Sequence, residues 1–254
     1  AAEAAPGPAD PELEHFRALQ REHAARDRER GGPPELLGEA ELEAEERELF
    51  PDGEAAACNL QFGAELPVEC SGTNAERVAP MQSFDEIHKQ FNVPGWLRDN
   101  IARCGFSQPT QVQRHAVPYA LVGRDVMASA PTGSGKTAAY LVPLAVALPE
   151  ESACSRPRAT YHGPARPLGL VVAPTRELCA QIHREARRLC HRSPFRLAHV
   201  YGGVSLRQQA SELARGSDLC TTTPGRLADL VDREIISLEA VGFLVLDEAD
   251  AMLE

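Results

Sequence analysis

The stretch APTGSGKT, at 130–137, brings two glycines, three hydroxyl side chains and a lysine together in eight positions. A tight turn at Gly133 and Gly135 lets successive backbone N–H groups point inward, where they attract the oxygens of a phosphate. Lys136 is suited to reach the β- and γ-phosphates of a nucleotide, and the hydroxyl of Thr137 is suited to Mg²⁺. These residue types predict a phosphate-binding loop.

The lysine in this loop supports that interpretation over a plain Gly/Ser turn that caps a helix. The chain contains 24 arginines but only two lysines, Lys89 and Lys136. An ammonium is a compact point charge, whereas a guanidinium is a planar fork, so the two are not interchangeable beside a phosphate.

A second acidic stretch, FLVLDEAD at 243–250, supplies the groups that such a loop needs for catalysis. An apolar strand delivers Asp247 to the carboxyl edge of a sheet, where ligands bind in α/β folds. Asp247 can hold Mg²⁺ through water, and Glu248 can orient and deprotonate an attacking water. On its own, DEAD could be a solvated acidic turn, but the preceding apolar run favours the catalytic interpretation.

Short apolar runs alternate with helical stretches in the body of the chain. This alternation predicts a doubly wound α/β domain with a parallel sheet. Trp96, Leu97 and Ile101 should face inward from an earlier helix, and Pro143 should kink the first helix after the loop. The strands are expected at 125–130, 168–173, 196–201, 218–223 and 243–247, the helices near 135–148, 176–191, 206–214 and 225–233, and a long surface loop at 149–167.

The N-terminal region differs in composition from the rest. Residues 1–54 contain 16 acidic and 6 basic side chains, while residues 55–254 are nearly neutral. Neither helical stretch in this region has a clear apolar stripe, so a disordered or loosely helical, solvated extension is expected rather than a specific partner helix. The predicted division is an acidic extension at 1–56 and an ATP-binding domain, incomplete, at 57–254.

Six short motifs occur in one order: GFSQPTQVQ (105–113), APTGSGKT (130–137), PTREL (174–178), GG (202–203), TPGR (223–226) and DEAD (247–250). Together they resemble the first RecA-like domain of a DEAD-box RNA helicase. Upstream, residues 48–84, and LPVECSG in particular, resemble the extension of the Ded/Vasa-type subgroup.

The resemblance implies ATP and Mg²⁺ as cofactors. Gln113 would make a bidentate contact to adenine, as a side-chain amide can. Phe84 would stack on the base, with Phe91 as the alternative. The implied catalytic residues are Lys136, Asp247 and Glu248, the metal-binding residues Thr137 and Asp247, and the ATP-binding residues Phe84, Gln113, Ala130, Thr132, Gly133, Ser134, Gly135, Lys136 and Thr137.

The remaining motifs are implied to bind RNA. Helix starts after Thr175, at the capping box Ser205-x-x-Gln208 and at Thr223-Pro224 present N–H groups that suit a sugar–phosphate backbone. Such contacts carry no sequence information, so little sequence preference is expected. The implied RNA-binding residues are Pro174, Thr175, Arg176, Gly202, Gly203, Thr223, Pro224, Gly225 and Arg226.

Two functions remain open: an ATP-dependent RNA helicase, and a truncated, non-catalytic ATP- or RNA-binding module. A metabolic P-loop kinase does not account for PTREL, TPGR or the segment at 105–113. The family's next motif and its second domain, with the arginine fingers, would follow Glu254. A fragment and a natural truncation both fit, and little activity is expected of this segment alone. An odd cysteine count without C-x-x-C pairs indicates a reducing cytoplasmic or nuclear compartment, and no apolar run is long enough for a membrane.

Overall fold

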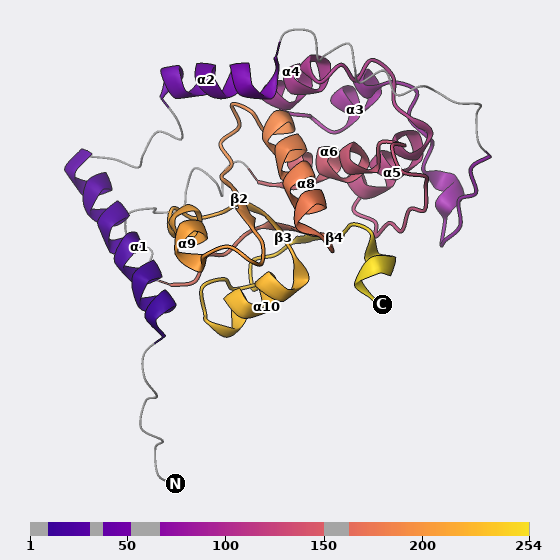
Figure 1. The fold of residues 1–254 in the computed structure, drawn as a ribbon. Coiled ribbons are helices and arrows are strands. Elements are labelled where there is room, and N and C mark those ends of the chain that lie inside the picture. Colours follow the sequence, from indigo (N-terminus) through magenta and orange to yellow (C-terminus); the bar gives the residue numbers. More distant parts are fainter. Residues whose placement is uncertain (1–9, 31–37, 52–66, 150–162, 254) are drawn as a thin grey trace. The chain divides into compact units, whose positions relative to one another are not determined.

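The computed structural model describes residues 10–30, 38–51, 67–149 and 163–253 (Figure 1). The chain divides into two compact units, each considered by itself. The sheet unit takes in residues 1–37, 150–183 and 194–254, and the helical unit takes in residues 38–149 and 184–193.

A parallel sheet forms the centre of the sheet unit. Its strands lie in the order β2-β3-β1-β4, and every neighbouring pair is parallel. β1 and β3, in the middle, are buried at every position, as expected of strands covered on both faces. The predictions for four strands are confirmed, with bounds β1 (Gly169–Val172), β2 (Leu197–Val200), β3 (Leu219–Thr222) and β4 (Phe243–Leu246).

Helices follow the strands of this unit in the predicted alternation. In α9, Leu206, Ala210 and Leu213 are buried at the spacing of one helical face and pack into the core beside β2. The unit also contains a short 3₁₀ turn, η3 (Ala249–Met252), after β4. The helices are α8 (Arg176–Leu189), whose last turns belong to the helical unit, α9 (Leu206–Ala214) and α10 (Pro224–Asp232).

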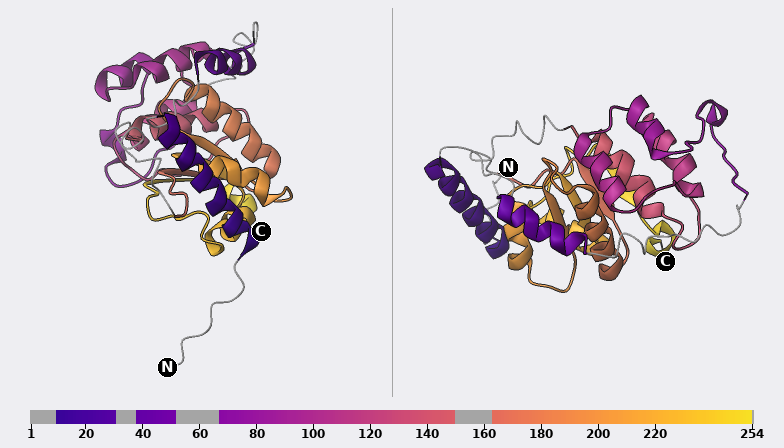
Figure 2. Two further views of the ribbon diagram at one scale, coloured as in Figure 1. Left: turned by 90° about the vertical axis from the view of Figure 1, so that its left-hand side faces the viewer. Right: turned by 90° about the horizontal axis from the view of Figure 1, so that it is seen from above.

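The expectation of a solvated N-terminal tail is wrong for the residues described. Helix α1 (Pro11–Arg30) packs against α9, as Figures 1 and 2 show, and Phe16 is fully buried in the sheet unit's core. The apolar pattern did not reveal this buried face of α1, because Gln20, one turn after Phe16, is polar. Its side chain is nevertheless buried, with 6% of the residue exposed. Its side-chain amide donates a hydrogen bond to the Gly163 carbonyl (2.8 Å), which offsets the cost of burial.

Replacing Phe16 by alanine should therefore destabilise the protein by about 3–5 kcal/mol, the usual cost of emptying a buried aromatic site. Urea unfolding followed by circular dichroism measures the change. Arg17→Ala, at the exposed neighbouring position of α1, is the matched control and should stay within about 0.5 kcal/mol of wild type. Equal effects of the two substitutions would mean that α1 is not docked.

The helical unit is built from five helices and a 3₁₀ turn in its described part. In α4, Leu97 and Ile101 are buried as predicted, while Trp96 is only half-buried. Pro143 lies inside α6, which continues past it. The elements are α2 (Glu39–Leu49), η2 (Ala75–Arg77), α3 (Phe84–Gln90), α4 (Gly95–Arg103), α5 (Gln111–Leu121) and α6 (Lys136–Ala147), and α5 packs closely against α6.

The strand predicted at 125–130 is not formed. These residues have no regular secondary structure, and Met127 is fully exposed. Among the described residues, none pairs with this segment in a β-ladder. A strand requires partners for its N–H and C=O groups, and the apolar letters of a segment do not reveal whether a partner is present.

Two other expectations fall largely on residues that the structure does not describe. The proposed loop at 149–167 includes residues 150–162, and the boundary at residue 56 lies within 52–66, so both stay predictions. Within the described end of this loop, Ala165 is buried and its N–H donates to the Ile235 carbonyl (2.7 Å). No helix in the described ranges is long and apolar enough to cross a bilayer.

Candidate nucleotide site and nucleic-acid interface

The glycine-rich loop of the helical unit has the backbone that its sequence predicts. Gly133 and Gly135 have φ values of 76° and 90°, in the left-handed region that favours glycine. A Cβ atom on Gly135 would lie 2.5 Å from the Gln113 side-chain nitrogen, so no side chain fits there. A Cβ on Gly133 would meet open space, which leaves room for a ligand over the loop.

Lys136 is the first residue of α6, and its ammonium folds back over the loop. The Nζ atom donates to the carbonyl of Ala130 (2.5 Å) and to that of Pro131 (3.2 Å). These carbonyls hold the ammonium beside the N-terminus of α6, where the helix dipole also favours an anion. The positive charge and the helix start therefore lie together, as a phosphate site requires.

The hydroxyl of Ser134 provides the test of whether a phosphate suits this loop. Its Oγ atom is buried and has no hydrogen-bond partner among the residues that the structure describes. Buried polar atoms are nearly always satisfied, so an orphaned hydroxyl in a glycine turn indicates a missing polar ligand. A phosphate oxygen, as in ATP, matches this donor. Thr132 is exposed at the mouth of the loop, and Thr137 is half-buried on α6.

Gln113 is brought to the phosphate loop by a capping box at the start of α5. The Gln113 side-chain oxygen accepts from the backbone N–H of Thr110 (3.0 Å), and the Gln113 N–H donates to the Thr110 hydroxyl (3.4 Å). The amide nitrogen of Gln113 donates to the Gly135 carbonyl (3.1 Å). Thr110 was not among the predicted site residues, although the T-x-x-Q spacing that signals a capping box was present in the sequence.

The amide of Gln113 keeps capacity for a ligand despite these bonds. An amide oxygen has two lone pairs and an amide nitrogen has two hydrogens, and one of each is used here. The residue is only 1% exposed, so its orientation is fixed by its surroundings.

A cavity of about 920 Å³ adjoins the loop within the helical unit. Its size is within the range of small-molecule sites. Its walls come from three stretches of sequence: residues 67–73 and Ala75 of the upstream extension, one face of α5 from Thr110 to Tyr119, and residues 123–134.

Phe84 lies away from that cavity, in the first turn of α3. It is 5% exposed and stacks on Phe106, with ring centroids 6.3 Å apart. Both rings line a separate hollow, together with His88 and Arg98. Phe91, the alternative, is half-buried directly after α3. The role of either ring in stacking on adenine stays a prediction.

In the sheet unit, the predicted catalytic and RNA-binding residues share one edge of the sheet. Parallel strands have their carboxyl ends at the same edge of the sheet. The motif PTREL follows β1, GG follows β2, TPGR follows β3 and DEAD follows β4. Asp247 comes after β4, and its backbone N–H donates to Val172 at the end of β1 (3.0 Å). The Asp247 side chain is buried, and one carboxylate oxygen accepts from the Glu248 N–H (3.0 Å). Glu248 has a left-handed φ of 49°.

Two pairs of motifs contact one another at this edge. The guanidinium of Arg176 lies against Gly203, where a Cβ atom would come within 2.1 Å of it. The N–H of Gly202 donates to the hydroxyl of Thr223 (3.3 Å). Gly203 has a φ of 84°, in the left-handed region that favours glycine, and a side chain there would also displace the Arg176 guanidinium.

Two of the three helix starts at this edge agree with the prediction, but the capping box predicted at Ser205-x-x-Gln208 is wrong. Ser205 precedes α9 without a side-chain cap bond, and the N–H of Gln208 donates to the Ser205 backbone carbonyl (3.2 Å) instead. The hydroxyl of Thr175 accepts from the N–H of Leu178 (3.2 Å) in the first turn of α8. Pro224 is the first residue of α10, after Thr223. Arg226 donates to the carbonyls of Tyr201 (3.1 Å) and Val204 (2.7 Å), so it holds the loop that carries the glycine pair.

Comparisons of this sequence with a protein-family model and with known proteins agree with this geometry. A family model for the DEAD/DEAH box helicase matches residues 110–254. The chain is 44% identical over 194 residues to "DEAD-box ATP-dependent RNA helicase 52A" of Oryza sativa subsp. japonica, which covers 75% of this chain and 31% of that protein. It is 39% identical over 209 residues to "Probable ATP-dependent RNA helicase vasa-like" of Penaeus vannamei, with 82% and 29% covered. The chain thus spans about a third of the length of these relatives.

Solved structures show the same fold. The RNA helicase Prp28 from Chaetomium thermophilum bound to ADP gives a TM-score of 0.58 at 32% identity, over 87% of this chain and 46% of that one. A DEAD box protein from Methanococcus jannaschii gives 0.57 at 30% identity, over 68% and 43%. The sheet is therefore that of a RecA-like α/β fold. With the phosphate loop, the DEAD turn and a family match over more than half of its length, the chain belongs to the DEAD/DEAH box helicase family.

Proposed function

We propose that this chain is the ATP-binding part of an ATP-dependent RNA helicase of the DEAD-box type. The observation that carries the proposal is the phosphate loop, where Lys136 and the unsatisfied hydroxyl of Ser134 lie at the start of α6. ATP is the cofactor that these groups and the buried amide of Gln113 fit. Both relatives carry the name of an ATP-dependent RNA helicase, which supports ATP hydrolysis coupled to RNA as the proposed reaction.

The reaction assigns a separate task to each group. Lys136 binds the β- and γ-phosphates. Thr137 and Asp247 would hold Mg²⁺, which would neutralise phosphate charge. Glu248 accepts a proton from the attacking water. The Asp247 carboxylate is buried and the Glu248 backbone N–H donates to it, which fixes the orientation of the acidic turn.

RNA is the proposed partner of the sheet edge. The N-termini of α8 and α10 and the glycine pair at 202–203 offer backbone N–H groups for phosphate and sugar oxygens. Arg176 lies against Gly203 and adds positive charge, while Arg226 is paired with Asp229 (3.3 Å) and positions the loop at 201–204. Contacts of this kind read the backbone, so RNA sequence should matter little.

The finer assignment to the Ded/Vasa-type subgroup belongs to the proposal as well. It is supported by PVECSG at 67–72, which lines the cavity beside the phosphate loop, and by the similarity to a vasa-like protein. A reducing cytoplasmic or nuclear compartment is consistent with the cysteines, of which those at 70, 179, 190 and 220 form no disulfide in the described part of the chain.

The proposal predicts that the chain prefers ADP over GDP through Gln113. Adenine offers a donor and an acceptor to an amide, and losing one such contact costs roughly 1–3 kcal/mol of discrimination, or about 5–150-fold. Titration with fluorescently labelled ADP and GDP measures the ratio in wild type and in Gln113→Glu. Glutamate keeps the oxygen that caps Thr110 but lacks the N–H donor, so the helix should survive while the preference falls.

Gln111→Glu, one position after the cap, is the matched control because it makes the same change outside the capping box. It should keep the wild-type ratio. Equal affinity of wild type for both nucleotides would overturn the assignment of Gln113 to adenine.

A further inference from the structure

Helix α2, which the sequence leaves as part of an acidic tail, is held in the helical unit by a group of cationic side chains. Glu45 and Glu48 both accept hydrogen bonds from Arg187 (3.1 Å and 2.9 Å). Glu46 pairs with Arg103, and Glu39 pairs with Arg192 (2.9 Å). Four carboxylates of one helix are thus matched by arginines from α4 and from the C-terminal end of α8 and the residues after it.

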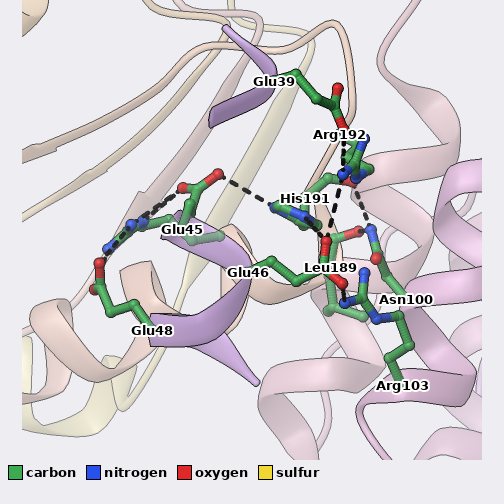
Figure 3. Close-up of polar contacts among 10 residues, drawn as sticks. Glu39, Glu45, Glu46, Glu48, Asn100, Arg103, Leu189, His191 and Arg192 are labelled. Carbon is green, nitrogen blue, oxygen red and sulfur yellow. Dashed lines mark hydrogen bonds and ion pairs between the residues drawn. The ribbon is translucent and has the colours of Figure 1, made fainter. Parts of the chain in front are cut away.

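His191 lies at the centre of these contacts, as Figure 3 shows. Its Nδ1 atom is 3.2 Å from an oxygen of Glu45, and its Nε2 atom is 3.4 Å from an oxygen of Glu46. The side chain has no exposed surface. Each ring nitrogen of His191 thus faces a carboxylate of α2.

An aromatic residue anchors the end of the helix. The Arg103 guanidinium lies 4.4 Å from the centre of the Phe50 ring, and that of Arg188 lies 5.6 Å from it. The His191 ring meets Phe50 edge-on at 5.9 Å. Leu49 beside it is fully buried. A cationic site that surrounds a ring is selective for an aromatic residue as well as for charge.

The segment that carries His191 is fixed within the helical unit by hydrogen bonds. The side-chain nitrogen of Asn100 is buried in α4 and donates to the carbonyls of Leu189 (3.0 Å) and His191 (2.7 Å), which fixes the end of α8. Partial burial alone would raise the pKa of Glu46, but Arg103 and His191 lower it below its usual value. Hydrogen bonding from Arg187 lowers the pKa of Glu48 in the same way.

We propose that Arg103, Arg187, His191 and Arg192 form a recognition site for an acidic helix that ends in an aromatic residue, and that residues 39–50 occupy it as a detachable segment. An isolated helix as short as α2 is only marginally stable in water, so docking and helix formation are coupled. Gly38 and Pro51 flank the segment and interrupt the chain on both sides. The site accordingly takes the segment when it is supplied on a separate peptide. The pattern Glu-Glu-x-Glu-x-Phe favours a peptide helix over RNA, because an RNA backbone would use the arginines but leave the place of Leu49 unfilled.

Hydrogen exchange of the intact chain tests the docking. Glu46→Gln removes a charge that contacts Arg103, His191 and Arg192, and should lower the protection of α2 amides by roughly tenfold. Glu43→Gln makes the same change at an exposed position of the same helix and should leave protection unchanged. Unaltered protection in Glu46→Gln, with α4 and α6 amides as internal controls of the fold, would overturn the proposal.

A peptide supplied separately tests the recognition. A labelled peptide of residues 38–51 should bind the Glu46→Gln chain at least tenfold more tightly than wild type, whose site is occupied. The same peptide with Phe50→Ala should bind more weakly. No binding, or equal binding of the two peptides, would overturn the proposal. A 12-nucleotide single-stranded RNA that displaces the peptide from this chain, and whose binding Arg187→Gln abolishes, would instead identify a nucleic-acid surface covered by α2 and would also overturn it.

Discussion

Lys136→Ala should weaken ADP binding by roughly 10–100-fold while the unliganded protein unfolds at nearly the wild-type temperature. The affinity falls because a charged hydrogen bond to phosphate contributes about 1.5–3 kcal/mol. The stability is retained because the bonds of the Lys136 ammonium to described residues are to the carbonyls of Ala130 and Pro131, and the bond to Pro131 is exposed to solvent. Labelled ADP titration and a thermal melt without nucleotide measure the two quantities.

The chain offers a matched control, because Lys89 is its only other lysine and is exposed on α3. Lys89→Ala removes the same charge and should change neither affinity nor stability. If Lys136→Ala lowered the melting temperature by many degrees while Lys89→Ala did not, the ammonium would be a structural cross-link of the loop. Unchanged ADP affinity in Lys136→Ala would contradict the phosphate assignment directly.

The strands that the sequence predicts correctly are those whose partners are also present. LGLVVA, DLCTTT and FLVLD each contain a run of apolar or β-branched residues, and each pairs with another such run. DVMASA has a similar composition but gains no partner among the described residues, so it forms no ladder. Composition reports how well a segment suits a buried strand, and pairing depends on residues elsewhere in the chain.

Local signals predicted the site better than they predicted the N-terminal region. Positive φ at Gly133 and Gly135, and the caps at Thr175 and Thr223, follow from residue type and spacing over a few positions. The unsatisfied hydroxyl of Ser134 could not be predicted, because burial of one atom depends on tertiary packing.

The docking of α1 and α2 was missed for two different reasons. In α1, a single aromatic residue, Phe16, fills the core site, and the polar Gln20 interrupts the apolar face. In α2, ion pairs hold the helix to side chains that are distant in sequence. The acidic composition of α2 is also that of a solvated tail. A docked helix differs from such a tail in that its carboxylates have arginine partners, which the composition does not reveal.

A polypeptide limited to residues 1–254 should hydrolyse ATP very slowly, and RNA should not accelerate it. Phosphoryl transfer requires positive charge at the γ-phosphate in the transition state, and an arginine finger contributes roughly 10³–10⁵ in rate. By the family resemblance, those arginines come from a second domain, and the relatives extend well beyond the matched region. Phosphate release measured with and without single-stranded RNA, in wild type and in Glu248→Gln, gives the rates.

The Glu248→Gln variant separates a slow reaction from a contaminating one. Glutamine cannot accept the proton of the attacking water, so any residual hydrolysis that belongs to this site should fall by roughly 10²–10⁴. ADP affinity should be unchanged, since Glu248 follows the residue proposed to hold the metal and is not itself proposed to contact the nucleotide. If the 254-residue polypeptide showed fast, RNA-stimulated turnover that Glu248→Gln abolished, its own groups would suffice for the transition state. The stabilising arginine would then have to come from this chain or from a second copy, and a dependence of rate per molecule on protein concentration would distinguish the two.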